Sequence, residues 1–150
     1  IQHGVPHLSV TASDVCELAL RVARENAEGL GLPVEFVESR WFGALAQRRW
    51  ALIVSNPPYL AADDAHLQEG DLRFEPYTAL TDGGDGLSSI REIASHAPNH
   101  LEAGGWLLIE HGYDQAADVR SILELNGFSK VRLRHDLAGR PRATGGCWQC

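Results

Sequence analysis

The chain has 150 residues, 44% of them hydrophobic and 22% charged, which is the composition of one globular domain. It carries 13 Lys and Arg against 20 Asp and Glu, and a net charge of −7 argues against a surface that holds nucleic acid directly. No apolar run reaches the roughly 18 residues of a membrane-spanning helix. No leader peptide opens the sequence, so the membrane and secreted classes have no support.

The first half of the chain alternates between predicted strands and a predicted helix. Residues 7–12 are rich in β-branched side chains and predict a short strand, and residues 16–28 carry apolar side chains at helical spacing. Strands follow at 34–37 and 51–55, the second being apolar throughout, as in a strand buried on both faces. It stops at Asn56, because the two prolines that follow cannot continue a central strand.

The second half begins with a long polar stretch, residues 60–85, whose length is typical of a functional loop. We expect Asp85 to cap a helix over 87–101, and Gly104-Gly105 to separate that helix from a strand over 106–110. The remaining elements are a helix over 115–125, a strand over 128–135, a turn over 136–141 and a strand over 142–150. This order predicts an α/β fold with a mostly parallel sheet, covered on both faces and closed by an antiparallel terminal hairpin.

Two smaller clusters lie at or near the end of the chain. The basic residues there are interpreted as the solvated face of a strand pair, with contact to an acidic or nucleic-acid-bearing partner as the alternative: Lys130, Arg132, Arg134, Arg140 and Arg142. The three cysteines, Cys16, Cys147 and Cys150, are an odd number, which argues against a disulfide framework and favours the cytoplasm. The lone C-x-x-C pair has no matching second pair, so we expect no metal site and interpret Cys147 and Cys150 as two separate thiols.

The sharpest chemical signal is Asn56-Pro57-Pro58-Tyr59, which follows a predicted strand at the edge where open α/β sheets bind ligands. The Asn56 side-chain oxygen and the Pro57 carbonyl can each accept one N–H of a substrate amide, and Tyr59 offers a flat face to it. An amide nitrogen is a poor nucleophile, so its methylation depends on holding it in line with an electrophilic methyl group. The alternative is a plain proline turn after a strand.

Residues after two other predicted strands are candidates for a nucleoside site. Asp14 can accept hydrogen bonds from both hydroxyls of a ribose, or it can cap the helix that follows. Trp41 and Phe42 can flank an adenine ring, or they can pack in the core. Spacing alone leaves these alternatives open.

From Asn56-Pro57-Pro58-Tyr59 outward, the sequence resembles the peptide chain release factor N(5)-glutamine methyltransferases over about residues 10–148. The four-residue motif alone does not decide this, because it also occurs in adenine-N6 DNA methyltransferases. The resemblance continues through Val22-Ala23-Arg24, Asn26-Ala27, Phe74-Glu75-Pro76, Ala79-Leu80, Gly84-Asp85-Gly86-Leu87, Leu101, Gly104-Gly105, Leu108, Glu110-His111-Gly112, Gln115, Asp136-Leu137-Ala138-Gly139 and Arg142.

The resemblance implies a class I, Rossmann-like methyltransferase with S-adenosylmethionine as methyl donor. Its substrate would be the glutamine of the Gly-Gly-Gln motif in release factors, and we expect a cytoplasmic monomer without direct contact to nucleic acid or membrane. Asp14 matches the ribose-binding acid and Trp41 an aromatic at the cofactor's base, to which we add its neighbour Phe42. Asn56 matches the residue that touches both cofactor and substrate. The catalytic candidates are Asn56, Pro57 and Tyr59, and together with Pro58 they form the substrate-amide site.

Three features of the resembled family lack a counterpart here: the glycine-rich cofactor loop, the central strand before it, and a small helical N-terminal domain. The chain also starts at Ile1 and contains no Met, so we expect residues 1–150 to be an N-terminally truncated part of the catalytic domain. Such a part would have unpaired strand edges and an exposed apolar face, and it would be poorly stable and inactive alone. Arg40 stands where relatives often carry an acid, which puts an acidic contact to the adenine in doubt.

Three other functions remain open. A ribosomal-protein glutamine methyltransferase would use the same chemistry, although the segments 74–76 and 136–139 favour the release-factor branch. A DNA adenine-N6 methyltransferase is disfavoured by the acidic charge and by the lack of a target-recognition segment. A degenerate domain that only binds protein is disfavoured by the intact segment 56–59.

Overall fold

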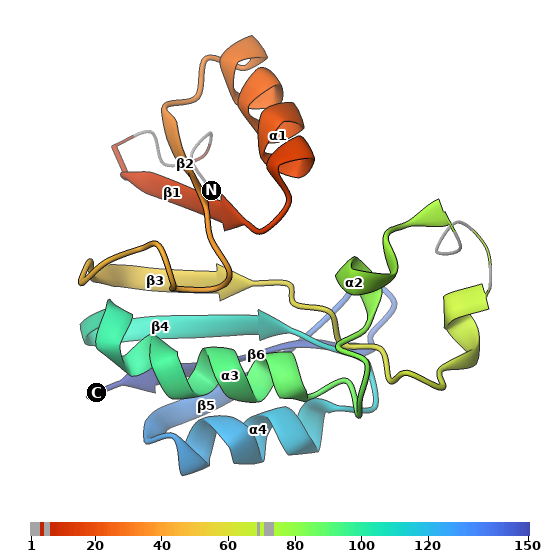
Figure 1. Ribbon diagram of the computed structural model, residues 1–150. Helices are drawn as coiled ribbons and strands as arrows, with labels where there is room; N and C mark the ends of the chain where they lie inside the picture. The colour runs from red at the N-terminus through yellow and green to blue at the C-terminus, as the bar shows by residue number, and fades with distance from the viewer. Residues whose placement is uncertain (1–3, 5–6, 69, 71–73) are drawn as a thin grey trace. The chain divides into compact units, whose positions relative to one another are not determined.

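The computed structural model describes residue 4 and residues 7–68, 70 and 74–150 (Figure 1). The chain divides into two compact units, residues 1–48 and 49–150, and each is described by itself. Residues 1–3, where we expect the truncation, lie outside the described ranges.

The first unit is a strand–helix–strand motif. β1 (Val10–Asp14) and β2 (Val34–Glu38) pair in parallel, and Asp14 stands opposite Glu38 at their carboxyl ends. α1 (Glu17–Gly29) connects the two strands. The predicted strand, helix and strand are therefore present, with the first strand starting and ending later than expected because the pairing with β2 begins only at Val10.

The second unit is built on a four-stranded sheet in the order β3-β4-β6-β5. β3 (Trp50–Ser55) pairs in parallel with β4 (Leu101–Glu110). β5 (Phe128–His135) and β6 (Pro141–Trp148) form the predicted antiparallel hairpin, and β6 also pairs antiparallel with β4. The predicted α/β class with a terminal hairpin is confirmed, although the strands form two sheets and not one.

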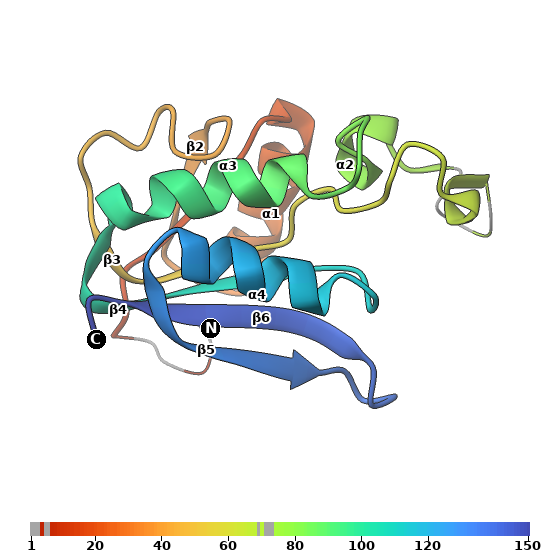
Figure 2. The same cartoon turned by 90° about the horizontal axis from the view of Figure 1, so that it is seen from below.

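Two helices, α3 (Ser88–His96) and α4 (Ala116–Leu125), lie over the same face of this sheet (Figure 2). Their apolar stripes form the core of the second unit together with side chains of β4. Its fully or almost fully buried members are Ile90, Ile93, Leu107, Ile109, Val119 and Leu123.

The opposite face of β3 carries exposed apolar side chains. Leu52 and Val54 are 43% and 56% exposed, and they stand in register with the half-buried Trp106 and Leu108 of β4. Because side chains alternate along a strand, these four point away from the face that α3 and α4 cover. The exposed apolar face that the sequence predicts is therefore present in this unit.

The start of β4 differs from the prediction. The strand begins at Leu101 and runs through Gly104 and Gly105, which were expected to break the chain. The pairing with β3 shifts register there, since Trp50 pairs with Leu101 but Leu52 pairs with Trp106. Gly104 adopts a φ of +79°, so the glycine pair forms an irregularity inside the strand and not its boundary.

The helix predicted over 87–101 is shorter than expected. α3 ends at His96, and the chain continues as a 3-10 helix, η3 (Ala97–His100), which contains a proline near its start. The predicted cap is wrong: Asp82 Oδ2 accepts the N–H of Ser88 at 2.7 Å, while Asp85 forms an ion pair with Arg91 at 2.7 Å. Asp85 instead accepts the N–H of Leu87, one residue before the helix, at 3.0 Å.

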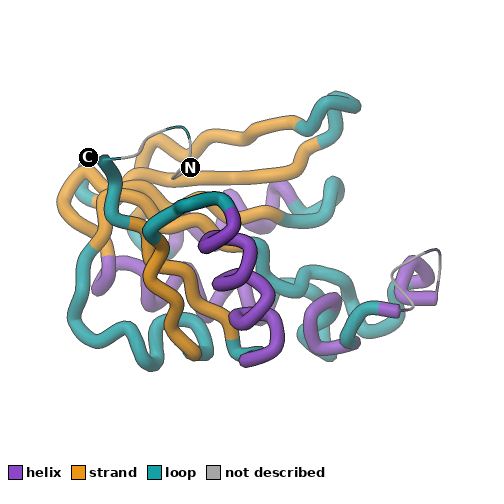
Figure 3. The backbone as a smooth tube through the Cα atoms, turned by 90° about the horizontal axis from the view of Figure 1, so that it is seen from above, coloured by secondary structure: helices purple, strands orange, loops and turns teal. Residues whose placement is uncertain are grey.

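Short helical segments interrupt the long polar stretch before α3 (Figure 3). They are η1 (Ala65–Gln68) and α2 (Tyr77–Leu80). None of the helices in the described ranges is long and apolar enough to cross a membrane.

The hairpin between β5 and β6 turns at Asp136, whose Oδ1 accepts the N–H groups of Ala138 and Arg140 at 2.9 Å each. Most of the basic residues on this hairpin are exposed, as a solvated strand pair requires. Cys147 and Cys150 lie close together at the end of the chain, with Cα atoms 5.8 Å apart. Gln149, between them, has a φ of +51° and turns the chain back.

Candidate active site

The segment Asn56–Tyr59 follows the carboxyl end of β3. Pro57 is fully buried, Pro58 and Tyr59 are half-buried, and Asn56 is exposed. The buried ring anchors the segment, and the two prolines restrict its backbone because each fixes φ. The amide of Asn56 is thus accessible on a segment with little conformational freedom.

Backbone hydrogen bonds attach the far end of this segment to the chain before α3. The N–H of Leu60 donates to the carbonyl of Leu80 at 3.0 Å, and Leu60 forms a short parallel bridge with Thr81. Two residues further on, the N–H of Ala62 donates to the carbonyl of Gly84 at 2.9 Å. The chain therefore leaves the segment in a fixed direction.

The side-chain amide of Gln115, at the start of α4, joins three loops. Its Nε2 donates to the carbonyl of Tyr59 at 2.9 Å and to that of Gly86 at 3.5 Å. Its Oε1 accepts the N–H of Gly112 at 2.8 Å. One amide thus connects the loop after β3, the loop after β4 and the turn before α3.

Gly86 permits this close approach. Its φ is +74°, and a Cβ atom there would overlap the carbonyl oxygen of Tyr59 and lie 2.9 Å from Nε2 of Gln115. Any other residue would have to displace the backbone of the Asn56–Tyr59 segment. Glycine is therefore required at position 86 because a Cβ atom would clash there and because the positive φ disfavours other residues.

A carboxylate organises the turn that carries Gly86. Asp82 Oδ1 accepts the N–H groups of Gly84 at 2.9 Å and Gly86 at 3.1 Å. Burial raises the pKa of Asp82, but the N–H groups of Gly84, Ser88 and Gly86 together bring this pKa below its ordinary value. An ionised Asp82 therefore holds the turn against the segment after β3.

The loop after β4 is fixed by a buried histidine. His111 is fully buried, its Nδ1 donates to the carbonyl of Gly112 at 2.7 Å, and its Nε2 accepts from the hydroxyl of Thr144 at 2.8 Å. Burial lowers the pKa of His111, so the ring stays neutral in this tautomer. Gly112, which binds Gln115 through its N–H, is thereby held on its other side.

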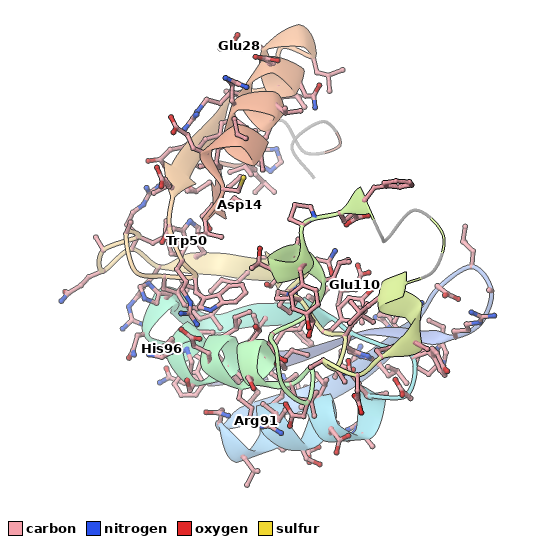
Figure 4. All side chains as sticks on the ribbon, turned by 45° about the vertical axis from the view of Figure 1, so that its right-hand side comes forward. Asp14, Glu28, Trp50, Arg91, His96 and Glu110 are labelled. Atoms are coloured by element: carbon pink, nitrogen blue, oxygen red, sulfur yellow. A yellow bond between two sulfur atoms is a disulfide. The ribbon has the colours of Figure 1, made fainter. Side chains whose placement is uncertain are left out.

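In the first unit, Asp14 ends β1 at the turn into α1 (Figure 4). Its Oδ1 accepts the N–H of Cys16 at 2.7 Å, and its carbonyl accepts the N–H of Ser39 at 2.9 Å. The side chain is exposed. One carboxylate oxygen thus supports the turn before α1 without capping the helix, whose N-cap residue is Cys16.

Trp41 and Phe42 follow β2, and both are half-buried. Trp41 has a φ of +48°, and its Nε1–H is buried without a hydrogen-bond partner among the described residues. The hydroxyl of Ser39 donates to the carbonyl of Trp41 at 3.1 Å and accepts the N–H of Ala44 at 2.9 Å, which fixes the turn. A buried donor without a partner costs about 1–3 kcal/mol, so this N–H would gain from an acceptor.

An open cavity of about 350 Å³ lies at this turn. Its lining residues are Val15, Glu38, Ser39, Arg40, Gly43 and Ala44. The volume is in the range of small-molecule sites, and the mixture of a carboxylate, a hydroxyl and small apolar groups suits part of a nucleoside. Asp14, Trp41 and Phe42 are sequence neighbours of these residues and are not among them.

The predicted site residues fall into two groups by unit. The substrate candidates, Asn56 to Tyr59, are contiguous in the second unit, and the cofactor candidates Asp14, Trp41 and Phe42 belong to the first. Glu38 of the cavity was not identified from the sequence, although its place at a strand end is the same signal that indicates Asp14. Gln115 entered only through the resemblance, and no local pattern indicates that it reaches Tyr59, 56 residues earlier.

Solved structures with this fold are class I methyltransferases. A methyltransferase from Pyrococcus furiosus matches with a TM-score of 0.72 at 18% identity, covering 99% of this chain and 66% of that one. A 16S rRNA methyltransferase from T. thermophilus, in complex with AdoMet and guanosine, matches with a TM-score of 0.61 at 15% identity, covering 93% of this chain and 31% of that one. The chain has the class I methyltransferase fold.

Residues 1–85 match the Methyltransferase small domain family, and the chain belongs to that family. It is 53% identical over 143 residues to a release factor glutamine methyltransferase of Neisseria gonorrhoeae, covering 94% of this chain and 52% of the relative. It is 51% identical over 146 residues to that of Pseudomonas aeruginosa, covering 97% and 53%. The chain spans about half the length of these curated relatives, and the resemblance stated from its motifs is confirmed.

Proposed function

We propose that the full-length protein methylates the side-chain amide nitrogen of the glutamine in the Gly-Gly-Gln motif of peptide chain release factors. The observation that carries the proposal is the Asn56–Tyr59 segment, anchored by buried Pro57 with the amide of Asn56 accessible. The similarity to release factor glutamine methyltransferases supports the substrate.

The catalytic step depends on holding the substrate amide. The Asn56 side-chain oxygen accepts one N–H of the substrate and the carbonyl of Pro57 accepts the other, while the ring of Tyr59 lies against the amide plane. S-adenosylmethionine, when bound, supplies a methyl group on a positively charged sulfur. The substrate nitrogen would take this methyl group and release one proton, and the role of Asn56 and Pro57 would be to hold that nitrogen in line with the methyl. Such positioning contributes up to roughly 7–11 kcal/mol in well-oriented systems.

The cofactor is proposed to bind through the first unit. Asp14 accepts hydrogen bonds from the ribose hydroxyls, and Trp41 and Phe42 flank the base, with Asn56 contacting cofactor as well as substrate. The accessible carboxylate of Asp14, the unsatisfied indole N–H of Trp41 and the adjacent cavity of about 350 Å³ support this assignment.

We also propose that residues 1–150 are part of a larger catalytic domain. The curated relatives, which are about twice as long as this chain, support this proposal. The protein is proposed to act as a cytoplasmic monomer that binds release factors without direct contact to nucleic acid or membrane.

The test is methyl transfer from labelled S-adenosylmethionine to a purified release factor by the full-length protein. A factor with Gln→Ala in its Gly-Gly-Gln motif is the control. Label on the natural factor and none on the control is the expected result, and equal label on both would overturn the proposal. Label on ribosomal proteins alone would favour a ribosomal-protein methyltransferase, and a shift of duplex DNA with methylated adenine would favour a DNA enzyme. Absence of cofactor binding would favour a domain that only binds protein.

A further inference from the structure

We infer that Gln115 is a positioning residue for the methyl-accepting site, acting through the backbone of the Asn56–Tyr59 segment. The inference rests on the function proposed above. Gln115 does not belong to the segment, and its side chain reaches it from α4 across the loop after β4.

The bond to Tyr59 restrains the whole segment. Peptide planes are rigid and proline fixes φ, so few rotations remain between Asn56 and Tyr59. The buried ring of Pro57 fixes one part of the segment, and the 2.9 Å bond from Gln115 fixes the carbonyl at its end. Together they limit where the Pro57 carbonyl and the Asn56 amide can point.

The orientation of the Gln115 amide is itself determined. If the amide were rotated by half a turn, its oxygen would face the carbonyl of Tyr59 and its NH₂ would face the N–H of Gly112. Both hydrogen bonds would be lost. Gly112 is in turn held by the buried ring of His111, which fixes the position of its N–H. The NH₂ group of Gln115 therefore has to face the Asn56–Tyr59 segment.

Two substitutions distinguish the hydrogen bond that Gln115 donates to Tyr59 from the one that it accepts from Gly112. Gln115→Glu has the same shape and keeps an acceptor for the N–H of Gly112, but it places a carboxylate oxygen against the carbonyls of Tyr59 and Gly86. Gln115→Met has similar length and loses both interactions without adding charge. The matched control is Gln149→Glu, an exposed residue beyond β6.

The experiment measures kcat, KM for the release factor and cofactor affinity in the full-length protein. Both Gln115 variants are expected to lose about 10- to 100-fold in kcat, since small misplacements of reacting groups cost that much. Cofactor affinity of Gln115→Met should stay near that of the unsubstituted protein, its thermal midpoint should fall by several degrees because two hydrogen bonds are lost, and Gln149→Glu should be unaffected. A normal kcat in Gln115→Glu, or a loss in Gln115→Met alone, would overturn the inference.

Hydrogen exchange provides a readout that does not require activity. The N–H of Leu60, directly after Tyr59, should exchange faster in both Gln115 variants, whereas that of Gly112 should exchange faster only in Gln115→Met. Unchanged exchange at Leu60 overturns the positioning role. If the unsubstituted protein labels no release factor while Leu60 responds as expected, the proposed function fails and the restraint by Gln115 stands.

Discussion

The turns that follow β2 and β3 differ in how their polar groups are satisfied. After β3, the carbonyl of Tyr59 accepts from Gln115 and the N–H of Leu60 donates to Leu80. After β2, the buried indole N–H of Trp41 has no acceptor among the described residues. The chain thus shapes the proposed substrate side by its own hydrogen bonds, whereas the proposed cofactor side contains a buried donor without a partner among the described residues.

The largest expected effect is at the substrate side. Asn56→Ala should reduce methyl transfer by about 100-fold or more, because the substrate amide loses the acceptor that orients it. The side chain is exposed, so the free energy of unfolding should not change. Steady-state kinetics and thermal unfolding measure both, with Asn99→Ala, another exposed asparagine, as the control. Unchanged turnover in Asn56→Ala would remove the positioning argument.

The next effect concerns the space beside Tyr59. Gly86→Ala should lower the free energy of unfolding by about 2–5 kcal/mol, from a strained φ of +74° and from overlap with the carbonyl of Tyr59. Gly139→Ala is the matched control, since Gly139 has a φ of +77° but nothing within 4 Å of its Cβ position. It should lose only about 1–2 kcal/mol in denaturant unfolding. Equal losses would show that the carbonyl of Tyr59 is not held where the structure has it.

The buried histidine predicts a pH dependence. Burial lowers the pKa of His111 below its ordinary value of 6.5, so the unfolded chain takes up this proton before the folded one. Stability should therefore fall as the pH drops below 6.5, by at most about 1.4 kcal/mol per pH unit from this group. His111→Asn should reduce this slope, and His96→Asn, at an exposed position, should retain it. The same slope in both variants would contradict a buried neutral His111.

The smallest effect is expected on the cofactor side. Trp41→Phe removes the indole N–H and should weaken S-adenosylmethionine binding by about 2- to 10-fold, the worth of one hydrogen bond. The free energy of unfolding should stay equal or rise slightly, because an unsatisfied buried donor is removed. Calorimetric titration measures the affinity, with Trp148→Phe in the second unit as the control. Unchanged affinity would mean that the cofactor does not accept a hydrogen bond from the indole N–H of Trp41.

The sequence predicts the α/β class, the terminal hairpin and the Asn56–Tyr59 segment because each depends on local patterns. The sequence does not predict where β4 starts, because Gly104-Gly105 has the pattern of a strand boundary. Only the pairing with β3 shows that these glycines form an irregularity inside the strand. The sequence assigns the cap of α3 to Asp85 and does not indicate Asp82, because the path of the glycine-rich turn between them decides which carboxylate reaches the N–H of Ser88. The contact of Gln115 with Tyr59 is formed by tertiary structure alone.

The most direct measurement of the central claim is to map the transferred methyl group by fragmentation mass spectrometry. The full-length protein and its Asn56→Ala variant would each be incubated with S-adenosylmethionine and a release factor. We predict one added methyl group on the side-chain nitrogen of the Gly-Gly-Gln glutamine with the unsubstituted protein, and almost none with the variant. A methyl group on another residue, or equal modification by both proteins, would contradict the claim that Asn56 positions a glutamine amide for methylation.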